Sequence, residues 1–286
     1  MQIRLKAYAK INLFLEILGK RDDGFHELVT VMQEVDIFDD LAFEEIGEDC
    51  ISIVCSDSTI PVNNDNLIWK AADLFRNRCK IRNGVRIHLE KRIPVGAGLG
   101  GGSSDAAATF KGLNMLWQTG RDDIELMDMA GEIGSDIPFF IKGNTAVCKG
   151  RGEVVTPVSI NAEYVYVIVY PNLKINTSSI YKNLKLGLTK EMKDVNFFLN
   201  QLNGNDLAVI GKALFNRLGQ TIYGLHPDLL KLKNILEGFN FCGVQVSGSG
   251  SALFGLCERR CDAEEIREEL NKLGSVKVFV VSNIRN

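Results

Sequence analysis

The sequence predicts an α+β fold of two domains, and three patterns along the 286 residues support this prediction. Apolar residues alternate with other residues over positions 3–17, which is the period of a strand with one buried face. A strand at 85–89, a glycine-rich run and a helix at 105–117 follow one another. The last part of the chain is ordered as strand, helices, strand, glycine loop, strand, helix and strand, which is typical of a ferredoxin-like α+β domain.

The other elements of the first domain lie between these patterns. Strands are predicted near 29–35, 41–43 and 51–55 from their β-branched and aromatic residues. A helix at about 66–78 follows the start signal of Asn63, Asn64 and Asp65. A further helix at about 124–133 is expected to end at Gly134, with strands on both sides of Gly143.

The second domain is expected to begin after Pro157. A β-branched and aromatic run at 164–170 predicts its first strand. Strands at 242–246 and 252–256, a helix at 262–273 and a strand at 276–281 are predicted to close it. We therefore expect one domain over residues 1–158 and a second over residues 159–286.

Composition and charge exclude several classes of protein. The chain is 45% hydrophobic, enough for a globular core, yet no apolar run reaches the length of a membrane span. A net charge of −3 without a basic stripe argues against a nucleic-acid partner. The seven cysteines are scattered, and Cys257 with Cys261 lacks a second pair for zinc. We expect a cytoplasmic protein, monomeric or homodimeric, whose partner is a small molecule.

A glycine-rich run between positions 94 and 104 predicts a phosphate-binding loop. Five glycines fall within seven residues, and a helix begins directly after them. Glycine lets backbone N–H groups turn toward an anion, and a helix N-terminus adds N–H groups and the positive end of its dipole. The serines either cap the helix or bind a phosphate-bound Mg²⁺. The expected loop consists of Pro94, Val95, Gly96, Ala97, Gly98, Leu99, Gly100, Gly101, Gly102, Ser103 and Ser104.

Three common nucleotide-binding motifs do not fit this run. Gly96, Gly98 and Gly101 satisfy the spacing of a dinucleotide-binding loop, but the position for its acidic residue, about 20 residues on, falls in the turn-like stretch 121–123. No lysine follows the glycines as in a P-loop, and the sequence lacks the H-R-D and D-F-G runs of protein kinases. A flexible glycine turn with a serine cap is the structural alternative.

Four segments together resemble the GHMP kinases, a family that includes galactokinase and the homoserine, mevalonate and phosphomevalonate kinases. The glycine run resembles the second motif of this family; residues 10–13 with 22–26 resemble the first, residues 246–252 the third, and residues 134–140 a run typical of the members that act on a cytidylated alcohol. The resemblance covers the chain from end to end. It implies the two-domain GHMP kinase fold, with a mixed-sheet N-terminal domain, a ferredoxin-like C-terminal domain, an active site between them, and ATP and Mg²⁺ as cofactors.

The resemblance also implies two catalytic residues. Asp136 is expected to act as a base or as an electrostatic group, and Lys10 to keep it ionised and to orient the acceptor hydroxyl. From the residues alone, Lys10 is a strand lysine that faces a cleft or plain solvent, and Asp136 caps a turn. Because Asp136 follows the end of a helix and Pro138 favours an extended Ile137, we expect a sharp helix-to-strand turn there.

The acceptor implied by the resemblance is 4-diphosphocytidyl-2-C-methyl-D-erythritol, phosphorylated on its 2-hydroxyl in non-mevalonate isoprenoid biosynthesis. Phe25 and Tyr181 are expected to stack on its cytosine, and His26 to bind the polar edge of that base. Phe25 stands where many members have tyrosine, which keeps the stacking face and loses a phenol hydrogen bond. As structural residues, His26 would cap a turn and Tyr181 would be a half-buried helix residue.

Three further residues are expected beside the substrate, namely Asn12, Gly248 and Gly250. The two glycines either close over phosphate or form a tight turn between two strands.

Two other functions stay open at this point. One is a kinase for another small alcohol, such as homoserine or mevalonate, and the other is a ligand sensor without catalysis.

Overall fold

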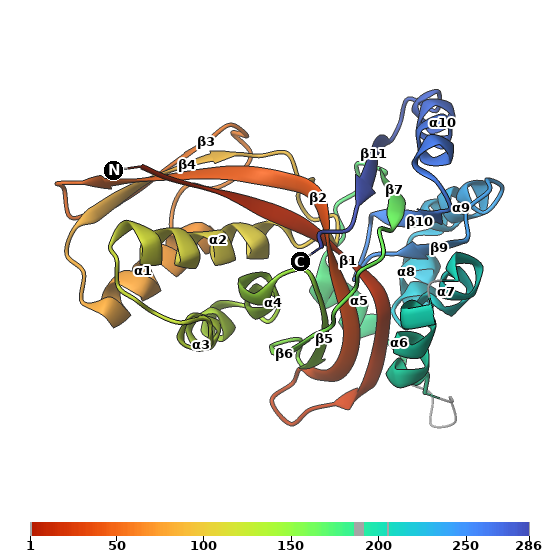
Figure 1. The fold of residues 1–286 in the computed structure, drawn as a ribbon, viewed down its shortest axis with the longest axis horizontal. Coiled ribbons are helices and arrows are strands. Elements are labelled where there is room, and N and C mark those ends of the chain that lie inside the picture. The colour runs from red at the N-terminus through yellow and green to blue at the C-terminus, as the bar shows by residue number, and fades with distance from the viewer. Residues whose placement is uncertain (1, 186–191, 205, 286) are drawn as a thin grey trace.

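The computed structural model describes residues 2–185, 192–204 and 206–285. Figure 1 shows two lobes joined by long strands. The first lobe contains the segments up to residue 157, and the second contains most of the remaining chain. In the described part of the chain, no helix is both long and apolar enough to cross a membrane.

The sheet of the first lobe is built on two long antiparallel strands, β1 (Gln2–Lys20) and β2 (His26–Ile46). The strand order is β3-β4-β2-β1-β8, and β5 pairs with β2 and β6. The two short strands expected at 29–35 and 41–43 are one strand, so that prediction was wrong. Asp36, Asp39 and Asp40 interrupt the apolar pattern, but Asp39 is fully buried and accepts hydrogen bonds from the backbone N–H groups of the loop after β4.

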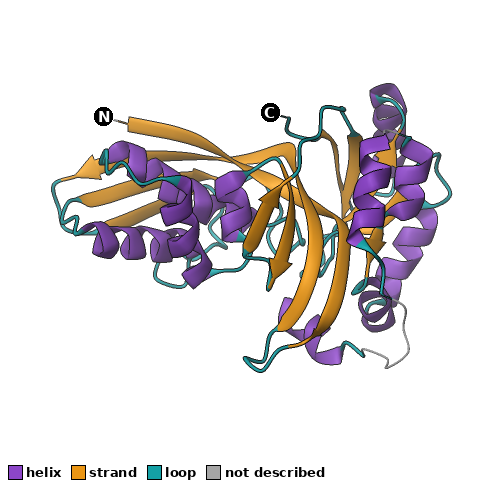
Figure 2. Ribbon diagram, turned by 60° about the horizontal axis from the view of Figure 1, so that its bottom comes forward, coloured by secondary structure: helices purple, strands orange, loops and turns teal. Residues whose placement is uncertain are grey.

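The helices of the first lobe cover one face of its sheet (Figure 2). The segments in chain order are β3 (Ile51–Cys55), α1 (Leu67–Cys79), β4 (Gly84–Glu90), α2 (Gly101–Leu116), α3 (Asp123–Ile133), α4 (Ile137–Lys142), β5 (Thr145–Gly150) and β6 (Val154–Pro157). Phe43 of the sheet, Phe75 of α1 and Phe110 of α2 are fully buried in one apolar cluster. Burial of each such side chain stabilises the folded state by about 2–3 kcal/mol.

The second lobe has a four-stranded antiparallel sheet of order β11-β7-β10-β9. With a crossover between its first two strands and α10 between its last two, this is the expected ferredoxin-like arrangement. Its segments are β7 (Val165–Tyr170), α5 (Thr177–Asn183), α6 (Val195–Gly204), α7 (Leu207–Ala213), β8 (Phe215–Asn216), α8 (Gly219–Leu225), α9 (Pro227–Leu236), β9 (Gly243–Val246), β10 (Leu253–Cys257), α10 (Arg260–Asn271) and β11 (Lys277–Ser282).

The two lobes are tied together along β1. Strand β8 belongs to the later part of the chain, yet it pairs in parallel with β1 and so joins the first sheet. Arg217, next to β8, donates to both carboxylate oxygens of the buried Glu16, at 2.6 and 2.5 Å. Every residue of β1 from Ala9 to Ile17 is buried. The apolar face of β1 at Ala9, Ile11 and Leu13 packs into one cluster with side chains of the second lobe, and Lys10 and Asn12 between them are buried as well.

Glu34 of β2 provides a test of the packing between the sheet and the segment after α4. Burial raises the pKa of Glu34 to about 7, against the opposing effects of the Asn144 N–H, 2.7 Å away, and of Lys111. The unfolded chain releases this proton near pH 4.5 and the folded chain near pH 7, so stability falls as pH rises between these values. The difference corresponds to about 3 kcal/mol.

Urea unfolding at pH 5 and pH 8 measures this effect. We expect wild type to lose about 2–3 kcal/mol relative to Glu34→Gln over that range, because glutamine keeps the acceptor for Asn144 but does not ionise. Parallel changes in the two proteins would contradict the assignment.

Candidate active site

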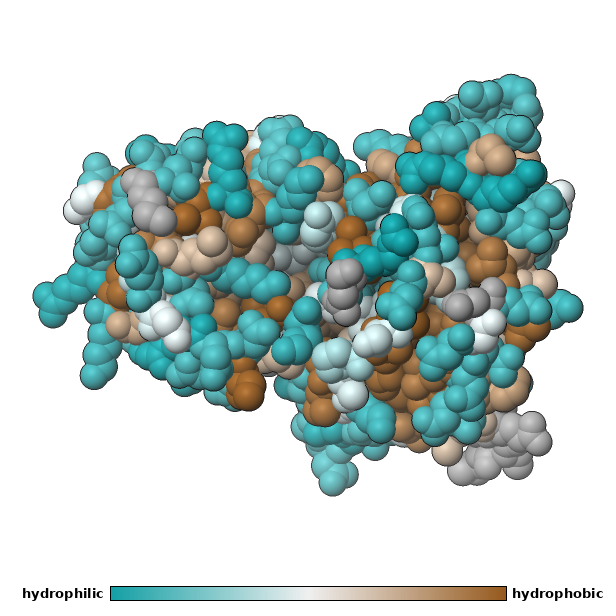
Figure 3. All heavy atoms as spheres, in the orientation of Figure 1, coloured by the Kyte–Doolittle hydropathy of each residue, from teal (hydrophilic) through white to brown (hydrophobic). Residues whose placement is uncertain are grey.

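A cavity of about 900 Å³ lies where the two lobes meet. Its wall is formed by β1 and β2, the glycine loop, Ser135 and Asp136, the turn after β5, helix α5, and the loop between β9 and β10. On the face of the molecule in Figure 3, hydrophilic side chains predominate, with hydrophobic ones gathered in patches among them. The residues that line the cavity run from Lys10 to Gly250, so the cavity joins segments from both ends of the chain.

The glycine loop connects β4 to α2, in the order expected for a phosphate site. Gly96, Gly98 and Gly100 line the cavity with φ of +69°, +78° and +71°, which non-glycine residues rarely adopt. A Cβ on Gly98 would lie 2.3 Å from the carbonyl oxygen of Ser247. This close approach, as well as the turn, requires glycine there.

The carbonyl groups of the loop are held by the protein. The carbonyl oxygens of Ala97 and Leu99 accept the backbone N–H groups of Ala252 and Lys10, both at 2.9 Å. The carbonyl oxygen of Gly98 accepts hydrogen bonds from the Lys10 ammonium at 2.8 Å and from the Ser247 hydroxyl at 2.9 Å. Three successive oxygens are thus engaged with protein groups, which favours an anion on the remaining side of the loop.

The two serines lie within the first turn of α2 and not at its cap. The N-cap is Gly100, and it makes no side-chain cap hydrogen bond. Ser103 is half-buried and Ser104 is buried, and neither lines the cavity. Pro94, Val95, Ala97, Leu99, Gly101 and Gly102 do not line it either. Within the described residues, no group of three His, Cys, Asp or Glu side chains gathers as a metal site.

Lys10 and Asn12 form the polar centre of the cavity. The Lys10 ammonium donates to the Asn12 amide oxygen at 2.6 Å and lies 4.0 Å from the nearer Asp136 carboxylate oxygen. Asn12 in turn donates to the Thr30 hydroxyl at 2.9 Å. Burial lowers the pKa of Lys10, and the neighbouring Asp136 and Cys148 oppose that shift. The ammonium is therefore fixed by two oxygen acceptors beside the carboxylate.

Asp136 precedes a helix, not a strand. The expectation of a helix-to-strand turn was wrong, because Ile137 and Pro138 begin α4. Proline is compatible with the first turn of a helix, where its missing N–H needs no partner. The strand expected before Gly143 is likewise α4, and a strand follows only at β5. The Asp136 carboxylate makes no capping hydrogen bond and is 38% exposed, so it is accessible from the cavity.

An aromatic group forms another part of the cavity wall. The His26 and Tyr181 rings lie 5.1 Å apart between centroids, one from β2 and one from α5. Phe25 is 52% exposed, and the Arg151 guanidinium lies over its ring at 4.9 Å. Burial lowers the pKa of His26, with a smaller effect of Lys20, so the neutral imidazole is favoured. Burial, and next Asp136, raise the pKa of Tyr181.

The loop between β9 and β10 places a second pair of glycines at the cavity. Gly248 and Gly250 form the expected turn between two strands and also line the cavity, and their closing over phosphate stays a prediction. A Cβ on Gly248 would lie 3.2 Å from the Lys10 ammonium. The Asn216 amide donates to the carbonyl oxygen of Gly248 at 2.8 Å, and the hydroxyls of Thr177 and Ser249 are 2.7 Å apart.

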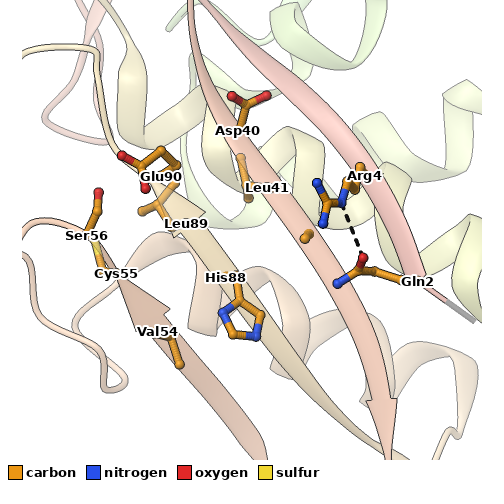
Figure 4. A pocket seen from close by; sticks show the side chains of 11 residues that line it. Gln2, Arg4, Asp40, Leu41, Val54, Cys55, Ser56, His88, Leu89 and Glu90 are labelled. Carbon is orange, nitrogen blue, oxygen red and sulfur yellow. Dashed lines mark hydrogen bonds between the residues drawn. The ribbon is translucent and has the colours of Figure 1, made fainter.

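A second cavity, of about 670 Å³, lies on the sheet of the first lobe away from these residues (Figure 4). Arg4 and Asp40 line it, together with His88 of β4, and Arg4 donates to Gln2 at 3.2 Å. It contains none of the residues that the sequence analysis selected.

Comparison with family models identifies the fold. The model described as GHMP kinases N terminal domain matches residues 66–144, and the model described as GHMP kinases C terminal matches residues 198–276. The chain belongs to the GHMP kinases. This GHMP kinase is 38% identical over 278 residues to a protein of Caldicellulosiruptor bescii named 4-diphosphocytidyl-2-C-methyl-D-erythritol kinase, covering 97% of this chain and 95% of that one.

Two further relatives carry the same kind of name. A protein of Brevibacillus brevis called 4-diphosphocytidyl-2-C-methyl-D-erythritol kinase is 39% identical, over 98% of this chain and 96% of that one. A crystal structure of 4-(cytidine 5'-diphospho)-2C-methyl-D-erythritol kinase superposes with a TM-score of 0.86 at 31% identity, covering 99% of this chain and 100% of that one. The two-domain GHMP kinase fold expected from the sequence is confirmed.

Several residues of the GHMP kinase cavity were not selected from the sequence. Arg151 and Gly152 line it from the turn after β5, and Thr30 supports Asn12 from β2. Asn216 fixes the second glycine loop from a two-residue strand. The run Lys149 to Gly152 contains two glycines and two cations, a composition that signals a turn but does not place it beside residues more than 100 positions away.

Proposed function

We propose that this GHMP kinase transfers the γ-phosphoryl group of ATP to the 2-hydroxyl of 4-diphosphocytidyl-2-C-methyl-D-erythritol, a step of non-mevalonate isoprenoid precursor biosynthesis. The observation that carries the proposal is the shared cavity. One part of its wall is two glycine loops that meet at Lys10, and another part is the aromatic group of Phe25, His26 and Tyr181. The relatives named as this kinase support the choice of acceptor.

In the proposed reaction, the glycine loop, Asp136 and Lys10 have separate roles. The loop of residues 94–104 and the N-terminus of α2 hold the phosphates of ATP. The acceptor oxygen forms a bond to the γ-phosphorus as the bond to the ADP oxygen breaks, and Asp136 receives or polarises the hydroxyl proton. Lys10 orients the hydroxyl and balances charge near Asp136, because its ammonium is fixed by Asn12 and Gly98.

Magnesium fits this arrangement. A magnesium ion bound with ATP takes most of its ligands from phosphate and water and needs one or two protein oxygens, so no cluster of acidic side chains is required. Neither Ser103 nor Ser104 lines the cavity, so a magnesium contact from either hydroxyl in the first turn of α2 stays a prediction. When bound, the ion would neutralise charge on the phosphates.

Removal of the aromatic platform tests the acceptor assignment. We expect Phe25→Ala to raise KM for the cytidylated acceptor by about 10- to 100-fold and to leave KM for ATP unchanged, because a base stacked on an aromatic ring is stabilised by about 1–3 kcal/mol. Steady-state ADP release measures both constants. Phe197→Ala is the matched control, since Phe197 of α6 is 61% exposed and does not line the cavity.

The same assay separates the alternative acceptors. Wild type should release ADP with the cytidylated acceptor and not with homoserine or mevalonate at equal concentration, because those alcohols cannot fill the aromatic end. Turnover with homoserine or mevalonate, unaffected by Phe25→Ala, would instead favour a kinase for another small alcohol.

A further inference from the structure

Arg151 occupies the turn that lies between the aromatic group and Asp136. Its guanidinium lies 4.9 Å from the centre of the Phe25 ring. The next residue, Gly152, lies beside Asp136, since a Cβ there would be 3.6 Å from Asp136 Oδ1. Both residues line the cavity. A ligand with its base at Phe25 and its hydroxyl at Asp136 would pass this turn with the part that joins them.

The Arg151 side chain is held in place from its own turn. Its backbone N–H donates to Glu153 Oε2 at 2.6 Å, and its Nε lies 3.6 Å from Glu153 Oε1. The side chain is 30% exposed, between the Phe25 ring on one face and the cavity. A planar guanidinium fixed in this way presents several N–H donors to a phosphate at little entropic cost.

The charge of the cavity wall is suited to an anion. Among the described residues that line it, the cations are Lys10, Lys20, Arg151 and Lys182, and the carboxylate is Asp136. Lys10 lies at the glycine loops, where its positive charge would be matched by the triphosphate of ATP in the proposed function. Arg151 lies at the aromatic side and so faces a different part of the bound ligands.

We infer that Arg151 is a specificity-determining residue that binds the diphosphate joining the cytosine nucleoside to the alcohol in the acceptor. The inference rests on the proposed function, because it takes its ligand from that acceptor. A purely structural role is the competing explanation, in which Arg151 only supports the Phe25 ring. The two differ in one respect: support of Phe25 affects every ligand that contains the base, whereas a phosphate contact affects only ligands that contain the diphosphate.

Calorimetric titration with cytidine and with CDP separates these roles. The ATP site is filled beforehand with Mg²⁺ and a non-hydrolysable ATP analogue, so that CDP is measured at the acceptor site. We expect Arg151→Gln to weaken CDP binding by about 10- to 100-fold and to change cytidine binding by less than about twofold. Arg151→Lys should lie between wild type and Arg151→Gln, since it keeps the charge and loses the fork of donors.

Lys149→Gln is the matched control. It removes the same charge two residues away, on an exposed side chain of β5 that does not line the cavity, and should bind both ligands as wild type does. Equal losses of cytidine and CDP affinity in Arg151→Gln, or no loss of either, would overturn the inference. Failure of the proposed function is seen separately, as absence of turnover of the cytidylated acceptor by wild type.

Discussion

Replacement of Asp136 by asparagine is expected to lower kcat by about 10²- to 10⁴-fold, the range for loss of a group that takes part in proton transfer. Asparagine preserves the size of the side chain and removes its charge, so the fold and the cavity should persist. KM for ATP should stay within about twofold of wild type, because the proposed function places the carboxylate at the acceptor hydroxyl and not at the glycine loop. Single-turnover measurements with saturating ATP and acceptor give the rate of the chemical step directly.

The control for this experiment is Asp128→Asn, an exposed aspartate of α3 outside the cavity. Lys10→Met extends the test, since Lys10 lies 4.0 Å from Asp136. If the two residues act as a unit, the double variant should be little slower than the slower single variant. A near-normal rate for Asp136→Asn would remove it from the reaction, and fully additive losses would show that the pair does not act together.

Gly98→Ala is expected to weaken ATP binding by about 10- to 100-fold, which corresponds to the loss of one hydrogen bond of about 1.5–3 kcal/mol from the loop to a charged phosphate. Alanine at this position needs a φ of +78° and brings a Cβ within 2.3 Å of the carbonyl oxygen of Ser247. The glycine loop would have to move away from the loop between β9 and β10, and with it the carbonyl that accepts from Lys10. Equilibrium titration with a fluorescent ATP analogue measures the affinity.

Gly224→Ala is the matched control for that variant. Gly224 lies in α8, outside the cavity and without a positive φ, and a Cβ there would meet no atom within 4 Å. The same methyl group should therefore leave ATP affinity unchanged and stabilise the helix by about 0.5–1 kcal/mol. Loss of ATP affinity in both variants, or in neither, would show that the shape of the loop at Gly98 does not determine binding.

The sequence predicted the parts of the fold that local patterns determine. The alternation over residues 3–17 identified β1, and the helix after the glycines was expected from its apolar spacing. The break assigned within β2 and the strand assigned before Gly143 were wrong because tertiary contacts override local preference there. Asp39 is satisfied by backbone groups of a distant loop, and Pro138 starts a helix instead of interrupting one.

The candidate site was predictable to the extent that its residues lie in recognisable motifs. Lys10, Asp136 and the two glycine loops were selected in this way, and the structure brings them into one cavity. Arg151 and Asn216 lie outside those motifs, and their positions depend on how β5 and β8 pair with the first sheet. Pairing between strands so far apart in sequence is a property of the whole fold, which local patterns do not specify.

Phosphorus NMR of the reaction with MgATP and 4-diphosphocytidyl-2-C-methyl-D-erythritol tests the central claim most directly. The γ-phosphate resonance of ATP should disappear as a phosphomonoester resonance appears in equal amount, while the two diphosphate resonances of the acceptor persist. Coupling of the new phosphorus to the carbon at position 2 would place it on the 2-hydroxyl. Release of inorganic phosphate without a phosphomonoester, or cleavage of the acceptor diphosphate, would contradict the proposed reaction.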